Sequence, residues 1–155
     1  MAYPQQVLRR FRVVFNAIKT HFRQIENDAG IGGAQLWALG VICENPGLGT
    51  SDLARAMDVH GSTASNLVRT LTERKLISVV KDSPDRRTVA LRITPAGRRV
   101  LRNAPGPFTG MLPAALASLD AGTLLRLDED LGKLIAALHA DERAAGIPLG
   151  QLSNE

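Results

Sequence analysis

The amino-acid sequence predicts a mainly α-helical protein with one small antiparallel β-sheet. Two short helical patterns, at residues 50–57 and 62–75, are separated only by a tight turn. A two-stranded hairpin is predicted directly after them, at residues 81–93, where Val, Leu and Ile alternate with Thr, Ala and Arg. Helices with apolar stripes flank this central part on both sides. This order predicts a winged helix-turn-helix joined to a helical dimerisation region that both termini form.

Composition and charge describe a folded chain with a basic centre. Of the 155 residues, 45% are hydrophobic, which excludes wholesale disorder. No apolar run approaches the ~20 residues that a membrane helix needs, and no secretory signal is apparent. The single cysteine, Cys43, excludes an intrachain disulfide and fits a cytoplasmic location. Residues 50–102 hold eleven Lys and Arg against five Asp and Glu, and this net charge of +6 suits phosphate binding.

The first two predicted helices span residues 4–28 and 34–44. Apolar residues recur along the first at spacings of three and four: Val7, Phe11, Val14, Ile18, Phe22 and Ile25. Glycines end the first helix, and an Asn-Pro-Gly sequence stops the second because Pro and Gly cannot continue a helix cheaply. We expect residues 1–30 to serve dimerisation.

The helix-turn-helix is predicted from caps and from the opposite faces of its second helix. Thr50 suits the N-cap of the third helix, and Asp52 suits its positive end. The fourth helix, residues 62–75, is apolar on one face. Its other face carries small polar groups and one arginine: Ser62, Thr63, Ser65, Asn66 and Arg69.

The region after the hairpin is predicted to be helical with one break. Thr94 caps a fifth helix, and Pro95 at its first position loses no helical bond. Residues 103–107 (NAPGP) interrupt it, and a helical piece follows at 108–119. Asp120 caps a last helix with a leucine stripe: Leu124, Leu127, Leu131, Leu134 and Leu138. The predicted parts are therefore residues 1–30, a winged helix-turn-helix at 31–102, a second dimerisation region at 103–146 and a flexible tail at 147–155.

Nearly the whole chain resembles the MarR family of bacterial transcription regulators. The matching features are Gln35, the segment TSDLARAMDVHGSTASNLVRTLTERKLI and the hairpin string DSPDRRTVALRITPAG. The resemblance implies that residues 62–69 enter the DNA major groove, that Asp85 supports the wing and that Arg87 reaches the minor groove. It also implies a dimeric regulator whose effector is a small aromatic or lipophilic molecule. The chain departs from the family pattern at Lys75 and His60, and at the NAPGP break.

The chemistry of the fourth helix favours DNA contacts over a merely solvated face. Asn pairs bidentately with adenine and Arg with guanine, while Ser and Thr reach phosphates or bases. We therefore assign base or phosphate contacts to the five polar residues named above. Arg74 is expected to touch a phosphate, or simply to end the helix favourably.

The two arginines at the hairpin tip, Arg86 and Arg87, suit a narrow minor groove, whose negative potential attracts arginine. The alternative is that one of them only pairs with Asp82 or Asp85 to hold the hairpin. We expect one structural pair and one DNA contact.

Other candidate sites have simpler explanations beside them. Cys43 lies in an apolar stretch and is expected to be an inert hydrophobe, and His21, His60 and His139 lack the spacing of a metal site. No metal and no cofactor are predicted. An effector pocket is the alternative to plain core for a set of aromatic, polar and sulfur side chains: Phe11, Arg12, Phe15, His21, Phe22, Trp37, Phe108 and Met111.

Two function classes remain open on the sequence. The first is a homodimeric, sequence-specific regulator, most simply a repressor of a palindromic operator in double-stranded DNA, relieved by a small organic effector. The second is a winged-helix module that binds protein partners instead of DNA. The basic centre favours the first. The sequence carries no motif of an enzyme, so catalysis is not expected.

Overall fold

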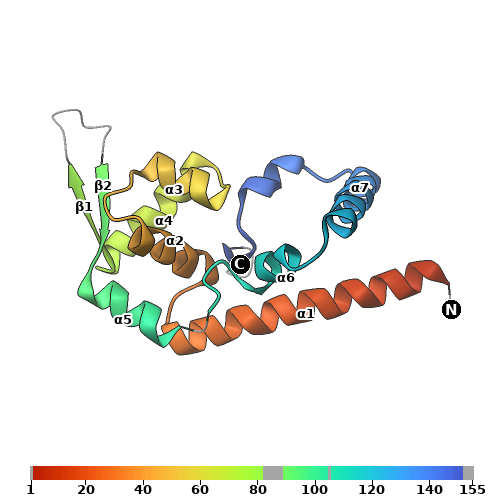
Figure 1. Ribbon diagram of the computed structural model, residues 1–155, viewed down its shortest axis with the longest axis horizontal. Coiled ribbons are helices and arrows are strands. Elements are labelled where there is room, and N and C mark those ends of the chain that lie inside the picture. Colours follow the sequence, from red (N-terminus) through yellow and green to blue (C-terminus); the bar gives the residue numbers. More distant parts are fainter. Residues whose placement is uncertain (1, 82–88, 105, 152–155) are drawn as a thin grey trace.

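The computed structural model describes residues 2–81, 89–104 and 106–151. It is mainly helical, with one two-stranded sheet at one end and a long helix running beneath the rest (Figure 1). In chain order the elements are α1 (Tyr3–Ala29), α2 (Gly33–Glu44), α3 (Thr50–Met57), α4 (Gly61–Glu73), β1 (Ile77–Lys81), β2 (Val89–Ile93), α5 (Pro95–Asn103), α6 (Met111–Ala117), α7 (Ala121–Leu138), and the 3-10 turns η1 (Glu142–Gly146) and η2 (Leu149–Gln151). The predicted fold class is confirmed.

The core surrounds α2, whose residues Leu36, Leu39 and Ile42 are fully buried. Helices α3, α4 and α5 and strand β2 all contact α2. From the helix-turn-helix, Leu53 and Leu71 are also fully buried. Burial of each such side chain contributes about 1.5–3 kcal/mol. The helix-turn-helix therefore packs on α2 through buried apolar side chains.

The sheet begins earlier than the sequence predicted. Strand β1 starts at Ile77 and pairs antiparallel with β2, from Ile77 opposite Ile93 to Lys81 opposite Val89. The prediction of a hairpin confined to 81–93 was wrong, because only β2 shows clear alternation. In β1 just Ile77 is buried and the next four residues are exposed. The hairpin tip, with Asp85, Arg86 and Arg87, lies outside the described residues.

Two predicted helix caps are confirmed and one is corrected. The Thr94 hydroxyl accepts a hydrogen bond from the Gly97 amide at 3.1 Å, and the Asp120 carboxylate accepts one from the Thr123 amide at 2.9 Å. Hydrogen bonds from Thr123 lower the pKa of Asp120. Thr50, however, is the first residue of α3 and not its cap. Gly49 occupies the cap position, where its carbonyl accepts the Leu53 amide.

Lys75 adopts a left-handed backbone conformation directly after α4, with φ of 60°. This conformation is unfavourable for a residue with a Cβ, and glycine usually provides it at a helix end. We expect Lys75→Gly to raise the free energy of unfolding by about 0.5–1 kcal/mol. Urea unfolding measures the change. Lys75→Ala, which removes the charge but keeps the Cβ, should give no such gain; an equal gain would contradict the strain.

Helices α1 and α7 carry apolar faces that the chain itself leaves uncovered. Along α1 only Ile25 is buried, and Phe15 is 63% exposed. No residue of α7 is buried, and Leu131 is 42% exposed. The outer half of α1 extends away from the core, and α7 lies above it (Figure 1). None of the described helices is both long enough and apolar enough to cross a membrane.

Residues 147–151 belong to the predicted flexible tail at 147–155, but the structure has a 3-10 turn within them. His139 ends α7 with a left-handed turn, and residues 141–151, here called the C-terminal strap, return to the helix-turn-helix. Turn η2 packs against α2. Gly150 is buried there, and a Cβ on it would come within 2.6 Å of the Ala34 nitrogen. Close backbone packing therefore holds a segment whose composition alone indicated a tail.

The piece predicted at residues 108–119 is shorter, because α6 begins only at Met111. Phe108 packs instead on Gly40 of α2, where a Cβ would lie 3.1–3.3 Å from its ring and Cβ atoms. The break at the NAPGP sequence is confirmed, since α5 ends at Asn103.

Candidate nucleic-acid interface and adjoining cavity

Helix α4 presents four of its five predicted contact residues to solvent: Ser62, Ser65, Asn66 and Arg69. The helix turns its apolar side inward, where Ala64, Leu67 and Leu71 are buried. Arg69 makes no hydrogen bond or ion pair with any described residue, so its guanidinium is available to a ligand. One helix face thus offers hydroxyl, amide and guanidinium groups that recognise base edges and phosphates.

Thr63 does not belong to this exposed face. Its side chain is only 8% exposed, and its hydroxyl donates to the Gly146 carbonyl of the C-terminal strap at 3.5 Å. The prediction of a groove contact was wrong for Thr63. No feature of the sequence indicates that a segment more than eighty residues away covers this turn of the helix.

Arg74 is held by the protein at the end of α4. Its Nη1 donates to the Gly30 carbonyl at 3.0 Å and lies 3.5 Å from Oε1 of Gln35. These bonds tie the end of α4 to the ends of α1 and α2. The sequence left two roles open for Arg74. The structure favours its role at the end of the helix over contact with a DNA phosphate.

An exposed ion pair lies on the surface of α3. Arg55 and Asp52 are bonded through their side chains, and this bond, with one from the Gly49 amide, lowers the pKa of Asp52. Because both groups are largely exposed, the pair contributes little to stability. On the two-stranded sheet, Lys81 and Arg92 are exposed as well.

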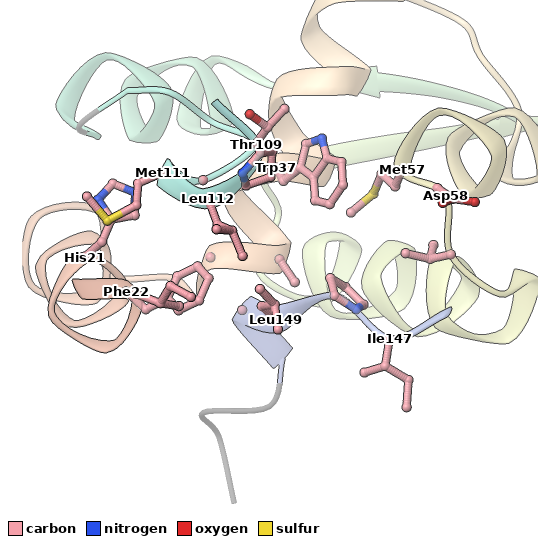
Figure 2. A pocket seen from close by; sticks show the side chains of 18 of the residues that line it. His21, Phe22, Trp37, Met57, Asp58, Thr109, Met111, Leu112, Ile147 and Leu149 are labelled. Atoms are coloured by element: carbon pink, nitrogen blue, oxygen red, sulfur yellow. The ribbon is translucent and has the colours of Figure 1, made fainter. Parts of the chain in front are cut away.

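A cavity of about 260 Å³ lies beside the helix-turn-helix. Its walls come from α1, α2, the end of α3, the start of α6 and the C-terminal strap. Figure 2 shows His21 and Met111 at one end and Met57 and Asp58 at the other. Atom Nε2 of His21 is buried and has no hydrogen-bond partner among the described residues. The cavity is thus lined mostly by apolar residues, with His21, Asp58 and Thr109 as polar side chains in its wall.

The structure brings together four of the eight residues predicted for a pocket: His21, Phe22, Trp37 and Met111. Phe11 and Phe15 stack on each other along the outer half of α1, with ring centroids 6.1 Å apart, and do not line the cavity. Arg12 is exposed and Phe108 belongs to the α2 packing. Helical spacing predicted these aromatics but could not show where along α1 the cavity lies.

For Cys43 and the histidines, the simpler explanations stay predictions. Cys43 is half-buried, and Nη1 of Arg98 lies 3.8 Å from its sulfur. Within residues 2–81, 89–104 and 106–151, no three His, Cys, Asp or Glu side chains gather in a way that could hold a metal ion.

Comparison with known proteins identifies the family. The family model described as MarR family matches residues 29–88. A putative transcriptional regulatory protein for the hcr operon of Thauera aromatica is 33% identical over 123 residues, which cover 77% of this chain and 73% of that protein. The chain belongs to the MarR family. The predicted resemblance is confirmed, and so is the prediction of a DNA-binding transcription regulator.

Two more distant similarities concern a repressor and a solved structure. The HTH-type transcriptional repressor MdtR of Bacillus subtilis is 23% identical over 132 residues, which cover 85% of each chain. The S. aureus MepR–DNA complex has the same fold, with a TM-score of 0.58, 23% identity, and coverage of 89% of this chain and 99% of that one. The likeness to this structure shows the fold of the chain.

Proposed function

We propose that this MarR-family protein is a dimeric repressor of a palindromic operator, released from DNA by a small aromatic or lipophilic molecule. The observation that carries the proposal is the exposed polar face of α4, with Arg69 free of protein partners among the described residues. Helix α4 enters the major groove in this account, as recognition helices of this motif do. The protein acts in the cytoplasm, where bacterial DNA lies, and we assign it no catalytic activity.

Dimerisation follows from the uncovered apolar faces of α1 and α7. The exposed apolar side chains of the two helices are Tyr3, Val7, Leu8, Val13, Val14, Phe15, Leu125, Leu127, Leu131, Leu134 and Leu138. Such extended apolar surface on a regulator indicates a protein contact. A twofold dimer presents two copies of α4 to half-sites about 34 Å apart. In this proposal a twofold dimer both covers the apolar faces of α1 and α7 and presents two copies of α4 to the DNA.

The wing contact rests on the sequence alone. We propose that Arg87 enters the minor groove while Asp85 and Arg86 stabilise or extend the tip. Arg87→Ala is expected to weaken binding to operator and random DNA alike and to reduce the salt slope of log Kd by about one. Titrations by fluorescence anisotropy at several salt concentrations measure both. Lys133→Ala, which removes an exposed cation from α7, is the control; equal effects of the two changes would contradict a wing contact.

The cavity supports the ligand part of the proposal. Its walls include Trp37 and Phe22, and the unpaired Nε2 of His21 can bond a carboxylate or phenol oxygen. The cavity lies against both α1 and the helix-turn-helix, so an occupant that prefers one arrangement of these parts changes the spacing of the two recognition helices. Misplaced helices lose the second half-site.

We expect a phenolic acid such as salicylate to quench Trp37 fluorescence and to release operator DNA over the same concentration range. His21→Leu should weaken this binding about fivefold or more, because one charge-assisted hydrogen bond is lost. The same substitution should leave operator affinity without the acid unchanged. Saturable quenching with no release of DNA would contradict the coupling between cavity and operator.

A further inference from the structure

The C-terminal strap makes three hydrogen bonds to the start of the recognition helix α4. The His60 amide donates to the Gly146 carbonyl at 3.2 Å, and the Thr63 hydroxyl donates to the same carbonyl at 3.5 Å. Nε2 of His60 lies 2.9 Å from the Arg143 carbonyl. Because a carbonyl only accepts, Nε2 must carry a proton and donate in this bond. Each of these bonds joins residues that are 83 or more positions apart in the sequence.

These bonds replace a local cap that α4 lacks. His60 occupies the N-cap position, and no side-chain cap bond is formed there. In a capping box, an acidic or amide side chain at the third helical position accepts the amide of the N-cap residue. Here the third position is Thr63, which is itself a donor, and the Gly146 carbonyl accepts the His60 amide instead. The Gly146 carbonyl therefore accepts the hydrogen bond that a side chain at the third helical position would otherwise accept.

The strap is shaped to reach this position. The Asp141 carboxylate accepts hydrogen bonds from the Arg143 amide and guanidinium at 2.8–3.0 Å, which closes the turn into η1. These bonds lower the pKa of Asp141 and raise the pKa of Arg143. A Cβ on Gly146 would overlap the His60 ring. With the His60 ring in place, only a residue without a side chain fits at position 146.

We propose that the strap is a distant cap that orders the first turn of α4 for DNA binding, with His60 and Gly146 as positioning residues. Ala145 and residues 147–150 of the strap also wall the cavity, so the same segment adjoins both the ligand space and the recognition helix. The effect on DNA rests on the proposed function, whereas the cap itself is a property of the free protein.

A double-mutant cycle tests the cap. Gly146→Ala adds a Cβ that overlaps the His60 ring, so the strap or the ring must shift and at least one bond of the cap is lost, while His60→Ala removes the ring and makes room for that Cβ. The double variant can therefore restore the backbone bond that Gly146→Ala alone breaks. Gly132→Ala is the matched control, because a Cβ at Gly132 in α7 meets no atom within 4 Å. All four proteins are compared with the parent as full-length chains.

Hydrogen exchange of the free proteins reports the cap directly. The informative amides are those of His60, bonded to Gly146, and of Ala64, whose bond to the His60 carbonyl closes the first turn. In Gly146→Ala we expect both to exchange about fivefold faster, the typical loss of an N-cap, with no change in the α2 core. The double variant should return towards the parent rate. Unchanged exchange in Gly146→Ala, or a double variant that exchanges faster still, overturns the proposal.

Operator affinity provides the functional readout. Gly146→Ala should weaken binding about fivefold and the double variant should recover most of the loss. If the parent protein binds no DNA at all, the proposed function fails while the exchange experiment still decides the cap. If the parent binds DNA and Gly146→Ala binds it equally well, the positioning role fails and the proposed function stands.

Discussion

Leu131→Glu is expected to split the dimer and to reduce operator affinity by roughly 100-fold or more, since a monomer loses the second half-site. Leu131 lies on the apolar stripe of α7, and each dimer would bury two such carboxylates without partners. An unpaired buried charge costs several kcal/mol, which exceeds what a small interface tolerates. Analytical ultracentrifugation at micromolar concentration measures the dimer, and anisotropy measures operator binding.

Gly132→Glu places the same carboxylate one residue further along α7, at a position open to solvent. It should leave the dimer and DNA binding intact. A parent protein that sediments as a monomer, or a Leu131→Glu variant that remains fully dimeric, would contradict the assignment of the α7 stripe to the interface.

The second large effect is expected at Arg69. Arg69→Ala should reduce the preference for operator over random DNA by about 1–3 kcal/mol, or roughly 5- to 150-fold, because a bidentate contact to guanine is lost. Stability should hardly change, since the side chain is exposed and lacks protein partners among the described residues. Competition binding with operator and random duplexes measures the preference, and thermal unfolding measures stability.

Arg69→Lys separates the charge of this residue from its geometry. Lysine keeps the positive charge but lacks the planar fork of arginine. It should therefore retain affinity for random DNA while losing much of the preference for the operator. If both substitutions lower affinity for the two duplexes equally, Arg69 contacts only a phosphate.

Features set by local sequence were predictable, and features set by distant contacts were not. Thr94 and Asp120 cap their helices through residues three positions away, so pattern alone identified them. Strand β2 was predictable from the alternation of its residue types, although its burial does not alternate, since Ala90 and Leu91 are both buried. In contrast, Thr63 looked like a groove contact, and only the return of the strap to Gly146 shows that it is covered. Arg74 likewise finds its partner at Gly30, 44 residues away.

The candidate cavity shows the same division. Periodicity identified the apolar face of α1, but Phe11 and Phe15 lie too far towards the outer end of that helix to reach the cavity. The wall formed by residues 147–150 was expected to be a flexible tail, since nothing in its composition marks a docked turn. Its position depends on close backbone packing between Gly150 and the start of α2.

Selection of binding sites from a random DNA library tests the central claim most directly. We expect enrichment of a palindrome whose half-site centres lie about 10 base pairs apart, bound by one dimer with steep salt dependence. Repeating the selection with Arg69→Ala should blur the base preference at one position of each half-site. A folded, dimeric protein that enriches no sequence would contradict DNA recognition by α4 and would favour the alternative of a winged-helix module that binds protein partners.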